Sequence, residues 1–190
     1  MKQITYATLF CAFALVFNSC GKKAETDSKE VAEETNEAKF DDSNIEKDTE
    51  FATDVADASM LEVKLGELAV SQGTLADVKT FAQTMIDDHK KANEELMAAA
   101  QAKNITLPAS LSEKSQKTYD DLAGKKGLDF DKAYADQMVD DHKKVVEKFK
   151  DEAEKGNDAD LKAWAAGKVA ALEHHLQMAE TLKETVKNAK

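Results

Sequence analysis

Cysteine, proline, glycine and aromatic residues are all scarce in this chain. Its 190 residues include two cysteines, one proline and seven glycines, and 6% of them are aromatic. Both cysteines, Cys11 and Cys20, lie close to the amino end. The rest of the chain can therefore form neither a disulfide nor a cysteine-ligated zinc site. The shortage of aromatic and β-branched residues argues against a large β-sheet.

Charge is unbalanced toward the acidic side. The formal net charge at pH 7 is −11, which would repel a phosphate backbone, so no nucleic-acid partner is expected. An acidic surface of this kind mainly keeps a protein soluble. Alanine, lysine, glutamate and leucine dominate, and these residues favour helices. The composition predicts an all-α protein whose length suits about one domain.

The amino end resembles an export signal. A weakly basic start precedes an apolar, uncharged run over residues 4–17. This run is shorter than the about 20 residues that span a bilayer as a helix, so it fits a cleaved signal peptide over residues 1–19. A small residue directly before Cys20 resembles the lipobox of bacterial lipoproteins, although Phe17 and Asn18 depart from its usual pattern. The alternative is an ordinary secreted protein with a stray cysteine.

With a lipobox, Cys20 becomes the lipidated first residue of the mature protein. Acyl chains contribute about 0.8 kcal/mol per buried methylene, so several chains would anchor it firmly to a membrane. Residues 20–48 are rich in charged and small polar residues and contain few large apolar ones. Such a segment cannot bury enough surface to fold. It is therefore predicted to be a disordered acidic tether on an exported, lipid-anchored protein.

Residues 49–190 are predicted to form one helical domain. Apolar residues recur at alternating steps of about three and four, the spacing of a packed helix seam. This period predicts four helices, over 49–72, 75–103, 129–155 and 159–187. Short connections join the first two and the last two helices, whereas a long crossover with a possible short helix at 112–122 lies between the second and third. This order of connections is typical of an antiparallel four-helix bundle with ferritin-like topology.

One sequence pattern occurs twice. Phe81-Ala-Gln-Thr-Met-Ile-Asp-Asp-His89 and Tyr134-Ala-Asp-Gln-Met-Val-Asp-Asp-His142 place a histidine near the centre of the second and third helices. Glu62 and His175 occupy similar positions on the seams of the first and fourth helices. Helices of similar length packed side by side would bring these four residues into one layer. Burying them without partners would cost several kcal/mol.

A divalent metal ion would compensate such a layer. Imidazole and carboxylate ligands suit zinc, copper or iron. The predicted ligands of one ion are Glu62, His89, His142 and His175. Four further residues are predicted to support these ligands. Met85 and Met138 lie one turn from the repeated histidines, and Asp88 and Asp141 directly precede them.

Other interpretations of these residues stay open. The carboxylate and the imidazoles could form a hydrogen-bond network with no metal, and the methionines could be ordinary core residues. His174, next to His175, is expected to face outward or into a boundary. The di-iron carboxylate pattern is disfavoured because it requires Glu-x-x-His on two helices, and this motif does not occur in the sequence.

Five motifs carry a resemblance to one bacterial family over about residues 51–182. They are Glu62-Val-x-Leu-Gly-x-Leu-Ala69, Val78-Lys-x-Phe-Ala-Gln-x-Met-x-x-Asp-His89, Gln137-x-x-x-Asp-His142, Leu161-Lys-x-Trp-Ala165 and His175-Leu-x-Met-Ala179. On these motifs the chain resembles the family named domain of unknown function 4142. The resemblance implies a ferritin-like fold and an exported protein, often of the outer membrane. It implies no established activity.

The sequence thus favours a membrane-tethered envelope lipoprotein whose helical domain binds one transition-metal ion for sequestration, sensing or stress protection. The alternative is a non-catalytic envelope or stress protein that acts through its surface, with the Glu–His layer as a structural network. An enzyme with an open metal position ranks last, because four protein ligands leave no obvious open site.

Overall fold

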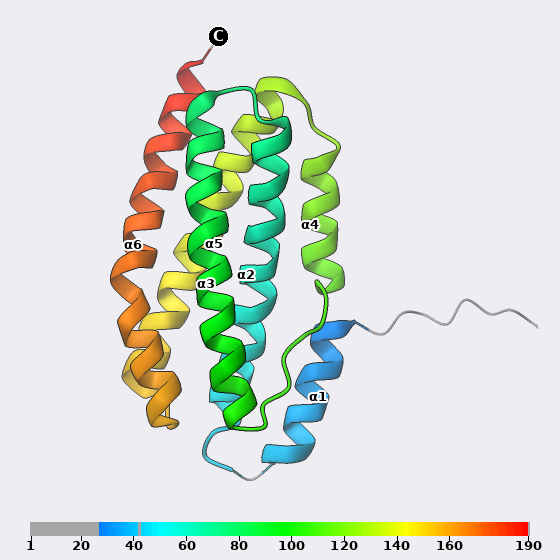
Figure 1. The fold of residues 1–190 in the computed structure, drawn as a ribbon, viewed down its shortest axis with the longest axis vertical. Coiled ribbons are helices and arrows are strands. Elements are labelled where there is room, and N and C mark those ends of the chain that lie inside the picture. The colour runs from blue at the N-terminus through cyan, green and yellow to red at the C-terminus, as the bar shows by residue number, and fades with distance from the viewer. Residues whose placement is uncertain (1–26, 42, 190) are drawn as a thin grey trace, which may run out of the picture.

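The computed structural model describes residues 27–41 and 43–189. Within them the chain forms six helices (Figure 1): α1 (Ser28–Phe40), α2 (Glu46–Gln72), α3 (Ala76–Ala102), α4 (Glu113–Ala123), α5 (Gly127–Lys155) and α6 (Ala159–Asn188). The all-α prediction is confirmed, but the described chain has six helices where four long helices and a possible short one were predicted. None of these helices is long and apolar enough to cross a membrane. The predicted signal peptide over 1–19 and Cys20 lie outside the described residues.

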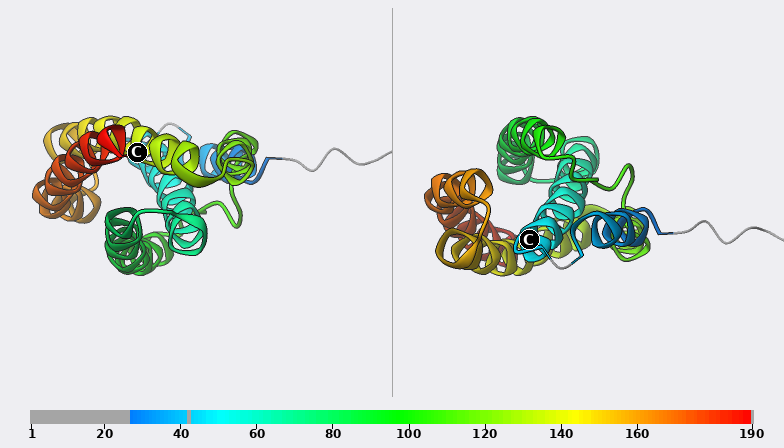
Figure 2. Two further views of the ribbon diagram at one scale, coloured as in Figure 1. Left: turned by 90° about the horizontal axis from the view of Figure 1, so that it is seen from above. Right: turned by 90° about the horizontal axis from the view of Figure 1, so that it is seen from below.

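The four long helices, α2, α3, α5 and α6, form two hairpins that pack against each other (Figures 1 and 2). Their bounds lie within a few residues of the predicted ranges, because the signals that end them are strong. Gly73 follows α2 and Gly156 follows α5, and the N–H of each glycine bonds a carbonyl in the last turn of its helix. The Asp158 carboxylate accepts the Leu161 N–H at 2.9 Å and caps the start of α6.

The two hairpins share a sequence pattern at their turns. Residues 73–82 read Gly-Thr-Leu-Ala-Asp-Val-Lys-Thr-Phe-Ala, and residues 156–165 read Gly-Asn-Asp-Ala-Asp-Leu-Lys-Ala-Trp-Ala. Both segments contain a hairpin turn and the first residues of the helix that follows it. The structure therefore relates α2–α3 to α5–α6, a correspondence that the sequence analysis missed.

Each hairpin also fixes the turn of the other. Asp131, near the start of α5, accepts the N–H groups of the two residues that follow Gly73. Asp48, near the start of α2, accepts the N–H groups of the two residues that follow Gly156. Hydrogen bonds to a charged acceptor are among the stronger ones. These reciprocal contacts fix how the two hairpins are aligned along the length of their helices.

Helix α1 lies in the segment predicted as a disordered tether, and that prediction was wrong for Ser28–Phe40. The helix packs on α2 and contacts the crossover that leads to α4 (Figure 1). Asn36 is buried and exchanges two hydrogen bonds with the backbone of Thr106, at 2.8 and 2.7 Å. Ala32 is also buried. Small and polar side chains hold this helix, so the search for large apolar residues could not find it.

Helix α4 lies in the long crossover, near the range predicted for a short helix, and packs beside α2 (Figure 1). Asp57 of α2 fixes its start. One oxygen of Asp57 accepts the Ser112 N–H at 2.8 Å, and the other accepts the hydroxyls of Ser112 and Ser115 at 2.8 and 2.7 Å. Both oxygens of this buried carboxylate therefore have donors, and the crossover is fastened to the long helices.

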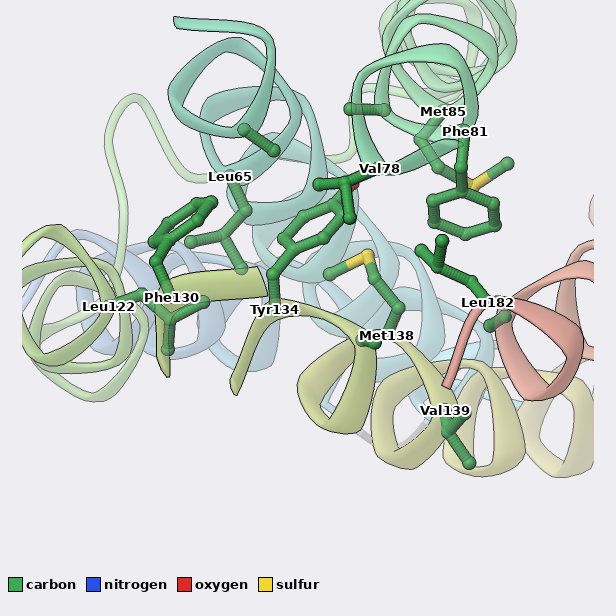
Figure 3. Packing of buried hydrophobic residues seen from close by; sticks show 14 of the residues in the cluster. Leu65, Val78, Phe81, Met85, Leu122, Phe130, Tyr134, Met138, Val139 and Leu182 are labelled. Atoms are coloured by element: carbon green, nitrogen blue, oxygen red, sulfur yellow. The ribbon is translucent and has the colours of Figure 1, made fainter. Parts of the chain in front are cut away.

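The apolar core consists of two clusters, one toward each end of the long helices. Figure 3 shows the first cluster, where Phe81, Tyr134 and Leu182 come from three different helices. In the second cluster the ring centroids of Phe51 and Phe149 lie 5.1 Å apart. Burial of each large apolar side chain contributes about 1.5–3 kcal/mol. Between the two clusters, at the middle of the long helices, the interior is polar.

Candidate metal centre

Each of the four long helices places one polar side chain in the interior between the two apolar clusters. These are Glu62 from α2, His89 from α3, His142 from α5 and His175 from α6, and none exposes more than 7% of its surface. The centroids of the three imidazole rings lie between 5.5 and 5.8 Å apart. We call these four side chains the polar layer.

The residues of the polar layer are buried because each lies on the inward face of its helix. On the same face, one turn away, each has a fully buried apolar neighbour: Leu65, Met85, Met138 and Ala179. The sequence thus puts ionisable groups where apolar groups would stabilise the fold more simply. Burying such groups costs free energy unless a partner compensates them.

Backbone and side-chain oxygens hold two of the rings from outside the polar layer. The Nδ1–H of His142 donates to the backbone carbonyl of Met138 at 2.9 Å. The Nε2–H of His175 donates to the Asp88 carboxylate at 3.0 Å. Oxygen partners of this kind fix the tautomer and orientation of metal-ligating histidines.

The third ring has a partner that the sequence analysis did not identify. Nδ1 of His89 lies 3.1 Å from the hydroxyl of Ser59, which is itself buried. Ser59 precedes Glu62 by one helical turn, and this spacing was the signal in the sequence that could have found it. All three imidazoles therefore have one nitrogen engaged by an oxygen atom.

The other nitrogen of each ring is buried without a hydrogen bond from the described chain. These atoms are His89 Nε2, His142 Nε2 and His175 Nδ1. Glu62 Oε2 also has no hydrogen bond there, although it lies 2.9 Å from His89 Nε2 and 3.6 Å from His142 Nε2. The 3.6 Å contact is too long for a hydrogen bond, and the direction of the 2.9 Å contact does not suit one. Since buried polar atoms are nearly always paired in native proteins, four such atoms in one layer require an explanation.

The three imidazoles could hold a metal ion. One ligand nitrogen from each ring lies within 4.8 Å of the other two. A tetrahedral ion with bonds of about 2.0–2.1 Å needs ligand nitrogens about 3.3 Å apart, so the rings would close inward on the ion. Glu62 is not part of this group of three, but it brings a carboxylate oxygen beside two of the rings.

The electrostatics of the polar layer favour an ionised carboxylate. Burial raises the pKa of Glu62, but positive charge on His142 and His89 outweighs burial and lowers this pKa to about 2. Burial lowers the pKa of His89, yet the Glu62 carboxylate raises it above its ordinary value. For His175, burial and the two other histidines lower the pKa despite the hydrogen bond to Asp88. His175 is therefore favoured in its neutral form, with a lone pair for a ligand.

The residues predicted to support the site lie in different surroundings. Asp88 accepts a hydrogen bond from an imidazole, whereas Asp141 accepts one from Gln137 at 2.7 Å and has no hydrogen bond or ion pair to a ring among the described residues. The side chains of Met85 and Met138 belong to the first apolar cluster (Figure 3). Met138 reaches the polar layer through its backbone carbonyl and not through its sulfur.

Comparison with known protein families matches residues 30–182 to the family described as domain of unknown function (DUF4142). The chain belongs to the DUF4142 family. This confirms the resemblance found in the sequence. The match begins within α1, so the DUF4142 domain starts before residue 49, where the sequence analysis placed its boundary. No curated protein and no solved structure matches the chain.

Proposed function

We propose that this DUF4142 protein binds one transition-metal ion, zinc, copper or iron, in its polar layer. His89, His142 and His175 supply three nitrogens, and Glu62 supplies a carboxylate oxygen as the fourth ligand. One observation carries the proposal: each imidazole is buried, and each has one nitrogen without a hydrogen bond from the described chain. Imidazole and carboxylate groups are ligands that these ions accept.

Charge in the polar layer supports the same conclusion. Positive charge on His142 and His89 keeps Glu62 ionised, and without such compensation a buried carboxylate costs several kcal/mol. A divalent cation held by neutral imidazoles would supply this positive charge itself. Because the ligand set requires the folded chain, the free energy of metal binding would add to the stability of the fold.

The sequence of the amino end supports a place for this site in the bacterial cell envelope. The apolar run over 4–17 and the lipobox-like residues before Cys20 fit an exported lipoprotein anchored to a membrane, in this proposal the outer membrane. The four long helices would form a ferritin-like antiparallel bundle, with α1 and α4 added on one side. The protein would sequester, sense or buffer the metal and so protect the cell from metal stress.

A second candidate rests on the contact between Glu62 and His89. Their separation of 2.9 Å and the raised pKa of His89 suit a buried ion pair in a structural network. The protein would then be a non-catalytic envelope protein that acts through its surface. Such a pair leaves the inner nitrogens of His142 and His175 without partners, so the metal site accounts for more of the polar layer.

Metal analysis of the purified whole chain, carrying no histidine tag, tests the proposal. We expect about one equivalent of zinc, copper or iron, and a melting temperature that falls by roughly 5–10 °C on chelation, as loss of a ligand at about 100 times its Kd would produce. A chain without metal, whose melting temperature does not respond to added Zn²⁺, Cu²⁺ or Fe²⁺, would overturn the metal site and leave the structural network.

A further inference from the structure

A cavity of about 220 Å³ lies beside the polar layer. Side chains from all four long helices line it. Its lining includes Glu62, His89 and His175, which are three of the four proposed ligands. The exposed side chains of Asp88 and Lys91 also line it. The cavity therefore connects the proposed metal site to the protein surface.

The mouth of the cavity lies between α3 and α6, and two bridges between these helices frame it. The hydrogen bond from His175 to Asp88 forms the first bridge. In the second bridge, Glu95 of α3 accepts a hydrogen bond from Trp164 Nε1 at 2.9 Å and pairs with Lys168. All five residues except Glu95 line the cavity. The bridges hold the two helices in place while leaving the stretch between them open.

Small side chains keep this stretch open. Ala92 of α3 lies one turn from His89, and Ala171 of α6 lies one turn from His175, and both alanines line the cavity. A leucine or phenylalanine at either position would extend into the same space. The two methyl groups leave space beside the polar layer that a larger side chain would fill.

The walls of the cavity are mostly apolar, with surface provided by Phe149, Trp164 and Leu172. Lys91 and Lys168 offset the charges of the carboxylates Glu62 and Asp88, which also line it. A divalent ion at the proposed site would therefore give the lining a net positive charge, which attracts an anionic ligand in a poorly solvated site. At about 220 Å³ the cavity is smaller than the about 300–1,000 Å³ of sites for drug-sized ligands.

We propose that the cavity admits a small organic carboxylate to the metal ion. Its carboxylate oxygen would coordinate the ion, and its apolar body would lie against Phe149, Trp164 and Leu172. Sites of this kind can expand from four to five ligands, so Glu62 need not leave. This inference rests on the proposed metal site and assigns a class of ligand to it.

Titration of the Co²⁺-loaded whole chain with benzoate and with acetate tests the inference. Cobalt reports its ligands through visible absorption. We expect benzoate to change the spectrum and to bind about tenfold or more tightly than acetate, because its ring buries additional apolar area. Ala92→Leu should weaken benzoate binding about tenfold or more without lowering the cobalt content. Ala98→Leu, on the exposed face of the same helix and outside the cavity lining, should leave both unchanged.

The possible results separate this inference from the metal site. Cobalt uptake with no spectral response to benzoate overturns the inference and leaves the metal site intact. Equal affinity for benzoate and acetate, or benzoate affinity unchanged by both Ala92→Leu and Ala171→Leu, also overturns it. A chain that takes up none of Co²⁺, Zn²⁺, Cu²⁺ and Fe²⁺ overturns the metal site and the inference together. Ala171→Leu, with its neighbour Ala170→Leu as control, replaces the first pair if Ala92→Leu fails to fold.

Discussion

Asp57 and Glu62 are both buried carboxylates of α2, but their surroundings differ. Asp57 accepts hydrogen bonds from the backbone and hydroxyl of Ser112 and from the hydroxyl of Ser115. Glu62 Oε2 accepts none from the described chain and lies beside two imidazoles. The described chain thus supplies donors to Asp57 but not to Glu62 Oε2. The proposed metal ion would be the missing partner of Glu62.

This difference predicts that substitutions at Asp57 and in the polar layer change the free energy of unfolding in opposite directions. Removing a carboxylate whose donors are buried leaves those donors unpaired, which costs about 1–3 kcal/mol for each group. Replacing a whole set of buried charged groups by apolar ones of similar volume is often neutral or stabilising, by about 1–4 kcal/mol.

The largest effect is expected at Asp57. Asp57→Ala leaves the Ser112 N–H and the two serine hydroxyls without their acceptor, and we expect a loss of about 3 kcal/mol in the free energy of unfolding. Urea denaturation of the metal-free chain measures it. Glu67→Ala, on an exposed part of the same helix, serves as control and should change little. A loss below about 1 kcal/mol would contradict the structural role of Asp57.

The triple substitution of Glu62, His89 and His142 by leucine should act in the opposite direction. We expect the metal-free chain to gain about 1–2 kcal/mol in the free energy of unfolding, since the buried carboxylate is removed together with the two imidazoles that compensate its charge. The same variant should bind no metal. His174→Leu, at an exposed position next to His175, is the matched control and should keep its metal. Destabilisation of the triple variant would favour a structural network.

A smaller effect is expected for Asp88→Asn, because Asp88 acts on the site only through His175. Loss of the charged acceptor should weaken metal binding about 10- to 100-fold, as for other carboxylates that hold a metal-ligating histidine. Calorimetric titration with Zn²⁺ measures the change. Asp87→Asn, at the neighbouring exposed position, should leave the affinity unchanged. Equal affinities in the two variants would show that Asp88 does not support the site.

Glu152 provides a third kind of buried carboxyl group, one that lies beside another carboxylate. Burial and the neighbouring Asp48 raise the pKa of Glu152 to about 8. Because this pKa lies above the unfolded value, the stabilising contribution is fully present below about pH 4.5 and is lost as the pH rises through 8. The other hairpin has Ala69, an apolar residue, at the equivalent position.

Glu152→Gln removes this titration. Between pH 5 and pH 9 we expect the melting temperature of the unsubstituted chain to fall by about 2–4 °C more than that of the variant. This corresponds to roughly 1 kcal/mol, because solvent screens a carboxyl group that is only partly desolvated. Glu154→Gln, the same change at an exposed position of the same helix, is the control. Parallel pH profiles of the chain and its Glu152→Gln variant would show that the carboxyl pair does not affect stability.

The positions of the long helices and the convergence of the polar layer could be predicted from the sequence. The seam period located Glu62 and the three histidines, and Gly73 and Gly156 located two helix ends, because both signals are local. Helix α1 could not be found in this way, since Asn36 holds it through backbone hydrogen bonds to a distant loop. The cavity depends on which side chains fill a space between helices, and periodicity does not determine this.

The repeated histidine pattern also gave an incomplete view of the internal symmetry. It pairs α3 with α5, whereas the common turn sequence pairs α3 with α6. His89 and His142 therefore occupy different places in their hairpins. The similar sequences around the two histidines reflect their common position in the polar layer. The structure was needed to distinguish this similarity from the correspondence between the two hairpins.

The docking of α1 has a consequence for the distance at which an anchor at Cys20 would hold the protein. From Cys20 to Asp27 an extended chain spans at most about 25 Å, whereas the predicted tether over 20–48 could have spanned about 100 Å. Helices α1 and α4 lie beyond α2, on the side away from α6 (Figure 2). A lipid on Cys20 would therefore keep the α1 side close to the bilayer and turn the mouth between α3 and α6 toward the surrounding fluid.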